Sequence, residues 1–269
     1  DPNSKGFLTS NGVINWGDGT ITIGETSHTY TTAGEYVIKG KVHCNSDGNT
    51  SIKESLVEVY TIPTPSSKVG ILSSFIGCTK LKNVTIRNQD LTYSGHGGYS
   101  VAFKGCSSIQ KIDLNGSYGF ALGDTYYQFQ DCPGVLDLSN CRLEVVTALP
   151  LKYNKLSEII MRNAKVTGTI KGFFIRGGGV NSLVKVDLTG IDTSTITDFS
   201  EMFNGCTNLT TIIGIEDLDL NSATTLASMF RDCTSLQSLD LSSWNVSRVT
   251  STTSMFNGCT SLQSLNLSN

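Results

Sequence analysis

A spaced pattern of apolar residues recurs along most of the chain. Aligned on its cysteine, the recurring unit reads F-x-x-C-x-x-L-x-x-L-x-L, with Ile or Val in place of some leucines. The last positions of the unit alternate between apolar and polar side chains, which is typical of a short strand with one buried face. Copies of the unit cover residues 75–86, 103–114, 202–212, 229–242 and 255–268, and a worn copy that has lost two residues after its cysteine begins at Phe129.

Two further copies lack the cysteine and have Tyr153 and Val180 in its place. The anchor positions are therefore 78, 106, 132, 153, 180, 206, 233 and 259, and all intervals but one are 26 to 28 residues. One unit cannot bury its apolar face alone, whereas stacked units with parallel strands about 4.8 Å apart share one interior. The pattern predicts an all-β solenoid over residues 70–269, with one short parallel strand per repeat. The predicted repeat core consists of Phe75, Cys78, Phe103, Cys106, Phe129, Cys132, Phe203, Cys206, Phe230, Cys233, Phe256 and Cys259.

The repeats MFNGCTNLTTI (202–212) and MFRDCTSLQSLDLSSWNVSRVT (229–250) closely resemble the BspA-like leucine-rich repeats of bacterial surface proteins. The resemblance extends over roughly residues 70–269, and the copies anchored at 132, 153 and 180 depart from it. It implies a non-catalytic, cell-surface or secreted protein that adheres to a host or neighbouring-cell protein or glycan. A lipid anchor on a processed N-terminal cysteine would fit such a role, but that residue is not in this chain.

Residues 1–62 do not share the repeat. Two alternating runs, 36–42 and 57–61, are typical of strands, and Asp47-Gly48 suits a hairpin turn between them. The motifs WGDGT (16–20), His28-x-Tyr30 and Gly34-x-Tyr36 are similar to those of the PKD-type immunoglobulin-like sandwich.

That second resemblance implies that Trp16 fills a core, that residues 17–19 form a tight turn and that Tyr30 braces a corner. Two prolines at positions 63 and 65 block regular structure. We therefore expect a PKD-like β-sandwich at 1–62, a linker at 63–69 and the solenoid at 70–269.

The chain has eight cysteines, of which six occupy one offset in successive repeats. This regular placement favours buried free thiols that act as small apolar residues. A disulfide framework or a metal site is the alternative, but no C-x-x-C pair occurs, and Cys132 with Cys141 is the one plausible bridge. We expect Cys44 to be a core residue of the first domain, and we expect no metal ion or cofactor.

Catalytic signatures are missing from the sequence. It has no G-x-S-x-G elbow, no H-E-x-x-H and no Walker lysine motif, and among its three histidines only His96, in a glycine-rich stretch, is free of a strand or motif role. The simpler interpretation of His96 is a surface turn. The net charge of −3 argues against nucleic acid as a partner, and no apolar run is long enough to span a membrane.

Two sets of residues are candidates for binding. Asp113, Asp137, Asp187 and Asp240 fall at the predicted outward position of their strands, where they either form a solvated face or a recognition surface, and the adjacent Asp113 and Asp137 would favour a bound Ca²⁺. The other set lies on loops, where aromatic residues either anchor ligands or cover the edge of the rod. It consists of Tyr93, His96, Tyr99, Tyr118, Tyr126, Tyr127 and Trp244.

Two other functions remain open from the sequence. The sequence LQSLNLSN (262–269) contains a strand without a polar capping unit, so a structural role through pairing with another copy is one alternative. The other is an accessory module of a polysaccharide-degrading system, because PKD-like domains often accompany hydrolases.

Overall fold

The structure is a computed structural model, and it describes residues 5–7, 13–15, 19–23, 27–29, 39–40, 58–60, 75, 77–88, 91, 103–122, 129–145, 151, 154–174 and 182–268. These residues contain strands and one short 3₁₀ helix, and no α-helix. The strands are β1 (Lys5–Phe7), β2 (Val13–Asn15), β3 (Ile21–Ile23), β4 (Ser27–Thr29), β5 (Lys39–Gly40), β6 (Glu58–Tyr60), β7 (Asn83–Thr85), β8 (Lys111–Asp113), β9 (Tyr118–Leu122), β10 (Pro133–Asp137), β11 (Arg142–Val145), β12 (Lys155–Ile160), β13 (Lys165–Gly168), β14 (Lys185–Asp187), β15 (Thr211–Ile213), β16 (Ser238–Asp240) and β17 (Ser264–Asn266), and the helix is η1 (Ile215–Asp217).

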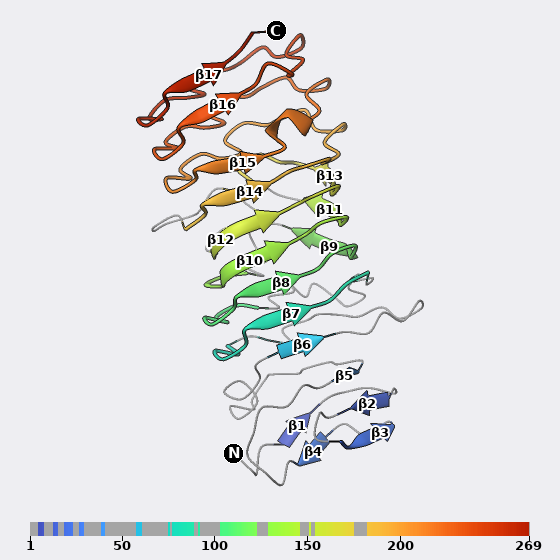
Figure 1. Cartoon of the computed structure of the whole chain (residues 1–269). Coiled ribbons are helices and arrows are strands. Elements are labelled where there is room, and N and C mark those ends of the chain that lie inside the picture. Colours follow the sequence, from blue (N-terminus) through green and yellow to red (C-terminus); the bar gives the residue numbers. More distant parts are fainter. Residues whose placement is uncertain are drawn as a thin grey trace.

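The repeats stack as a solenoid of parallel strands, as the sequence predicts. Each of the eight predicted repeats contributes one strand to the front of the stack, namely β7, β8, β10, β12, β14, β15, β16 and β17 (Figure 1). The first six belong to one sheet in that order, and β16 and β17 form a separate parallel pair. Pairing is in register: Val84 lies opposite Ile112, and Ile112 opposite Leu136. Equivalent apolar residues therefore stack directly on one another.

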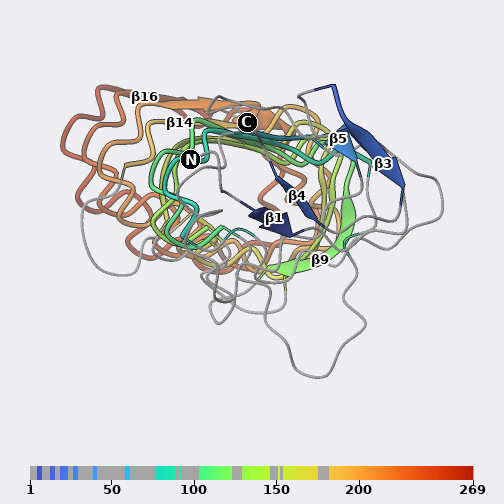
Figure 2. The same cartoon turned by 90° about the horizontal axis from the view of Figure 1, so that it is seen from below.

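The middle of the stack has a second parallel sheet, which the expectation of one strand per repeat missed. Its order is β13-β11-β9, and it lies across the interior from the front strands (Figure 2). Residues of β11 alternate between exposed and buried positions from Arg142 to Val145. This alternation allows the return segment of each middle repeat to form a strand as well, so two walls enclose the core.

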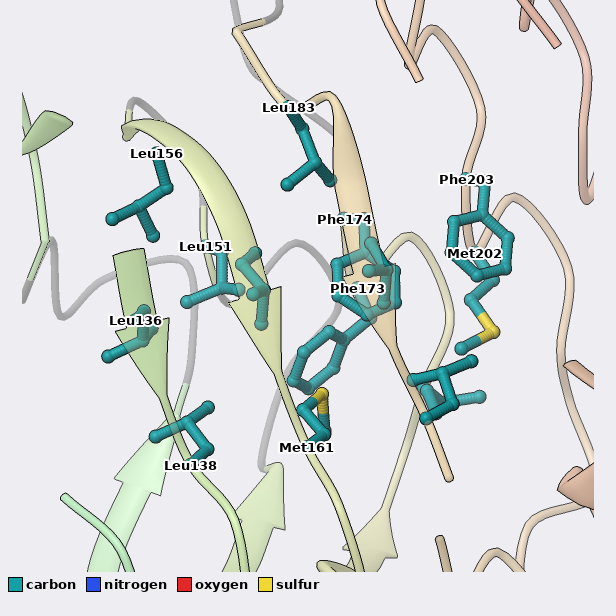
Figure 3. Packing of buried hydrophobic residues seen from close by; sticks show 14 of the residues in the cluster. Leu136, Leu138, Leu151, Leu156, Met161, Phe173, Phe174, Leu183, Met202 and Phe203 are labelled. Carbon is teal, nitrogen blue, oxygen red and sulfur yellow. The ribbon is translucent and has the colours of Figure 1, made fainter. Parts of the chain in front are cut away.

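The interior contains columns of stacked phenylalanine rings. Phe75, Phe103 and Phe129 form one column with centroids 5.4 and 5.9 Å apart. Phe174, Phe203, Phe230 and Phe256 form a second column, with centroids 4.9, 5.3 and 5.7 Å apart and nearly parallel planes. The sequence alignment missed Phe174, because Leu183 follows it by nine positions, whereas Leu209 follows Phe203 by six. Figure 3 shows Phe174 and Phe203 among leucines and methionines of neighbouring repeats.

The repeat anchored near residue 153 differs from the sequence alignment by one position. Leu151 takes the phenylalanine position, and the Asn154 amide N–H donates to the Leu151 carbonyl as each cysteine N–H does to its phenylalanine. Asn154 is buried, and its Oδ1 accepts from the amide of Leu156 at 2.9 Å. Asn154, rather than Tyr153, therefore replaces the cysteine; Tyr153 and Val180 both lie outside the described residues.

The cysteines form a ladder of free thiols. All those described are free, and each except the partly buried Cys259 is buried. The Cys106 thiol donates to the carbonyl of Phe75 in the preceding repeat at 2.8 Å, and the Cys132 thiol donates to Phe103 at 2.8 Å. The contact recurs for the later thiols, from Cys206 to Phe174, from Cys233 to Phe203 and from Cys259 to Phe230. The carbonyls of Phe75, Phe103, Phe203 and Phe230 each also accept a backbone N–H, so at these positions the thiol satisfies the second lone pair of the oxygen.

No disulfide joins Cys132 to Cys141. Both are free, and the Cys141 thiol donates instead to the Leu114 carbonyl at 3.1 Å. Burial raises the pKa of Cys141 to about 12, so this thiol stays protonated at neutral pH. The predicted core role of Cys44 falls outside the described residues.

The front of the chain is joined to the repeat sheet. β1 pairs with β4, and β2 pairs with β3 and β5, all antiparallel. β6, which the sequence placed in the sandwich, pairs in parallel and in register with β7, with Val59 opposite Val84. The predicted domain boundary at residue 62 therefore falls between two hydrogen-bonded strands of one sheet. The alternation at 57–61 suits a repeat strand as well as a sandwich strand, so the sequence did not distinguish the two. Trp16 and Tyr30 lie outside the described residues, and so does the predicted linker.

Candidate functional site: the outer face of the repeat sheet

Three of the four aspartates that were expected to face solvent are buried. Asp113, Asp137 and Asp187 have exposed fractions of 2%, 9% and 1%, and Asp240 alone is exposed. Each carboxylate turns back to accept a backbone N–H from the turn that follows its strand, at 3.2 Å from Asn115, 3.1 Å from Ser139 and 3.1 Å from Thr189. These carboxylates fix the turn and do not present a negatively charged face.

Cationic side chains from neighbouring repeats cover the buried carboxylates. Arg87 Nε donates to Asp113 Oδ2 at 3.0 Å, and Arg162 Nε donates to Asp187 Oδ2 at 2.7 Å. The side chains of Arg87 and Arg162 are 54% and 56% exposed, whereas those of their partners are 3% and 1% exposed. The outer layer of this part of the face is therefore cationic, although each pair is neutral.

The arginines overcome the cost of burying the carboxylates. Burial alone would raise the pKa of Asp113, but the hydrogen bonds from Arg87 and from the Asn115 amide lower it below its ordinary value. Burial would likewise raise the pKa of Asp187, but the hydrogen bonds from Arg162 and from the Thr189 hydroxyl and amide lower it below its ordinary value. Both groups are therefore ionised at neutral pH and hold their arginines in place.

Asp113 and Asp137 do not form a calcium site. The Lys111 ammonium lies between them, 3.5 Å from Asp113 Oδ2 and 3.4 Å from Asp137 Oδ2. It supplies the positive charge that a cation would have supplied. In the described part of the chain, no group of three or more His, Cys, Asp or Glu side chains is placed to hold a metal ion.

The candidate aromatic residues separate into three groups. Tyr118 begins β9 and is 42% exposed. Trp244 is not a surface anchor: it is 3% exposed, stacks against Phe230, and its indole Nε1 donates to the Ile215 carbonyl at 2.9 Å. The η1 segment of the preceding repeat supplies that carbonyl, so the indole packs inside. Tyr93, His96, Tyr99, Tyr126 and Tyr127 lie outside the described residues.

Two surface features were not anticipated from the sequence. Cationic and aromatic side chains follow one another across the second sheet at Tyr118, Arg142 and Lys165, because these residues face one another in register. An apolar hollow of about 390 Å³ lies on the last described repeats, lined by residues that include Leu241, Trp244, Val246, Met255 and Leu267. The alternation from Arg142 to Val145 was the available signal. Reading it as a second strand in the middle repeats would have predicted the row of Tyr118, Arg142 and Lys165.

Comparison with known proteins agrees with the repeat architecture. Residues 48–163 match the family described as "BspA type Leucine rich repeat region (6 copies)", and residues 176–269 match "Mycoplasma protein of unknown function, DUF285". A leucine-rich repeat protein from Bacteroides ovatus ATCC 8483, solved by crystallography, is 15% identical, with 91% of this chain and 84% of that chain covered at a TM-score of 0.25. No curated protein matches the chain in sequence.

The match at residues 48–163 includes β6, which pairs in parallel with the first repeat strand, β7, in the structure. Among the described residues there is no helix with the length and apolar character needed to cross a membrane. In-register parallel strands, columns of phenylalanine and the thiol ladder together define the architecture. The chain is an all-β solenoid of parallel strands, and its residues 48–163 match the BspA-type leucine-rich repeat family.

Proposed function

We propose that this chain is a non-catalytic binding protein of a bacterial cell surface, which adheres to a host or neighbouring-cell protein or glycan through its repeat surface. The observation that carries the proposal is the continuous outer face of the parallel sheet from β7 to β15. Buried aspartates and the arginines above them hold this face in a fixed geometry. A preorganised surface loses little side-chain entropy on binding, which favours recognition.

Exposed apolar side chains on this face offer anchors for a protein partner. Ile213 in β15 is 39% exposed and Val184, directly before β14, is 44% exposed. Ile213 lies beside the Arg162–Asp187 pair, because Asp187 faces Ile213 in register. An apolar centre with a charged rim is typical of protein interfaces.

A binding screen against extracellular-matrix proteins and glycans tests the proposal. Ile213→Asp should weaken binding of the partner that the screen identifies, whereas Val246→Asp is the matched control, because Val246 is equally exposed at 43% and lies outside the sheet face. Silence across a broad panel, or equal losses in both variants, would count against adhesion through this face.

For the front strands we propose a PKD-like module. The antiparallel pairs β1–β4, β2–β3 and β2–β5 support this proposal.

A further inference from the structure

The corner between the two sheets carries a polar surface that is built in the same way in successive repeats. After β8, β10 and β12 the chain turns through a residue with positive φ, which is Gly116, Asn140 (φ 56°) or Asn163 (φ 52°), and then enters β9, β11 or β13. Asn140 Nδ2 donates to Asn115 Oδ1 at 3.0 Å, and Asn163 Nδ2 donates to Asn140 Oδ1 at 3.5 Å. These contacts order the exposed amides along the axis of the stack.

Arg142 stands beside this row of amides, two residues after Asn140. Its guanidinium carbon lies 5.9 Å from the centroid of the Tyr118 ring, which the preceding strand of the sheet places opposite it. A cation over a tyrosine face is stabilised by the ring quadrupole, and the contact restricts a side chain that otherwise has many rotamers. The arginine is therefore oriented before any ligand arrives.

Among the described residues, Arg142 differs from the cations around it because it pairs with no carboxylate. Arg162 pairs with Asp187, and Lys165 Nζ lies 3.0 Å from Asp192 Oδ2. Within the described ranges, no Asp or Glu lies within ion-pair distance of Arg142. The contact with Tyr118 leaves the guanidinium N–H groups available for a bidentate contact with an anion.

The chemistry around Arg142 suits an acidic carbohydrate better than a peptide. Amide groups of the asparagine row can donate to and accept from sugar hydroxyls, and Arg142 can hold a carboxylate or a sulfate. The turn residues of this corner are polar or glycine and offer no aliphatic anchor of the kind that peptide recognition needs; they are Asn115, Gly116, Ser139, Asn140, Arg162 and Asn163. Tyr118 is the exposed aromatic residue beside them.

We propose that this corner, formed by Tyr118, Asn140, Arg142 and Asn163, is a binding site for an anionic glycan that carries carboxylate or sulfate groups. The proposal rests on the binding role proposed above and identifies one class of ligand and a site for it. It concerns a surface other than the sheet face around Ile213, so the two sites can be tested separately.

Binding of defined polysaccharides to the full chain tests the site. The probes are polygalacturonate for carboxylate, dextran sulfate for sulfate and neutral dextran as the uncharged reference, each measured at low and high salt by biolayer interferometry. We expect one or both polyanions to bind, more weakly at high salt because exposed charges are screened, and neutral dextran to bind at least tenfold more weakly. The stronger polyanion identifies the anionic group.

Variants assign the binding to the corner. Arg142→Ala should weaken polyanion binding about tenfold or more, since it removes hydrogen bonds to a charged group. Tyr118→Ala should weaken it by a smaller factor, and Arg142→Lys should restore part of the loss. Arg248→Ala is the matched control, because Arg248 is an exposed arginine on a distant repeat, and it should leave binding unchanged. Circular dichroism should show unaltered melting for all four variants.

Absence of polyanion binding would overturn the site, and so would an equal loss in Arg248→Ala. If the partner found in the adhesion screen still bound Arg142→Ala while no polyanion bound the parent chain, the glycan site would be refuted and the proposed adhesive function would stand. Loss of that partner in Ile213→Asp with intact polyanion binding would show that the two surfaces act separately.

Discussion

Removal of one ring from the middle of the phenylalanine column should cost far more stability than removal of the ring at its end. Phe203 has an exposed fraction of 0% and lies between Phe174 at 4.9 Å and Phe230 at 5.3 Å. Truncation of a fully buried phenylalanine to alanine costs about 3–5 kcal/mol, because transfer energy is lost and a cavity remains. Phe203→Ala should therefore lower the free energy of unfolding by about that amount.

Phe256 provides the matched control. It is partly buried, and among the described rings it stacks on Phe230 alone, at 5.7 Å. With about half of the ring contacts, Phe256→Ala should cost roughly 1–2 kcal/mol. Phe203→Leu should fall between the two, because the equivalent residue in another repeat is Leu151, which is also fully buried.

Urea unfolding followed by far-UV circular dichroism measures the stability of all three variants. Each repeat contacts its neighbours only, so Phe203→Ala is also expected to broaden the transition or divide it in two, as the halves of the stack unfold separately. Hydrogen exchange should localise the weakening to the repeats on either side of Phe203. A loss for Phe203→Ala no larger than that for Phe256→Ala would refute the continuous column.

Two further perturbations test the turns and the buried charges. Asp187→Asn should lower the free energy of unfolding at pH 7 by about 1–2 kcal/mol; the loss is limited because the half-exposed Arg162 can still be solvated. The pKa of Asp187 is lowered in the folded chain, so its carboxylate stabilises the fold at pH values above the unfolded pKa near 3.9, and this contribution is lost as the pH falls through the folded pKa. The difference in unfolding free energy between parent and variant, measured by urea titration, should therefore begin to shrink below about pH 4. A difference that does not change with pH would contradict the pairing. Gly168→Ala places a Cβ in steric overlap with the Val145 carbonyl oxygen. It should cost more than Gly205→Ala, because Gly205 also has a positive φ but a Cβ there meets nothing within 4 Å and should cost about 1 kcal/mol. Equal thermal shifts would contradict the close approach of the two strands.

The repeat and its register could be read from the sequence because they depend on local spacing. The offsets among Phe203, Cys206 and Leu209 recur from copy to copy, and stacking is the arrangement that buries all of them. Where the spacing changes, the prediction was wrong by a residue or missed a partner, as it was at Asn154 and Phe174.

The surface could not be read in the same way, because burial there depends on neighbours in other repeats. Asp187 lies at an outward position of its strand, yet Arg162, from the preceding repeat, covers it. Trp244 resembles a loop aromatic in sequence, but the carbonyl that accepts its indole N–H comes from Ile215, 29 residues earlier. Tyr118 and Arg142 likewise meet only because β9 and β11 lie side by side. No local pattern records these contacts.

Thiol accessibility tests the stacked interior most directly. The native chain would be alkylated without reductant, digested and mapped by mass spectrometry, before and after denaturation. We expect the buried cysteines to resist alkylation in the native state and to react completely once unfolded, since they are free, and the pKa values of Cys106 and Cys141 are raised to about 12. Cys259, which is only partly buried, should react first. Rapid native labelling of Cys106 or Cys206, or any disulfide-linked peptide among these residues, would contradict the stack of repeats with reduced thiols inside.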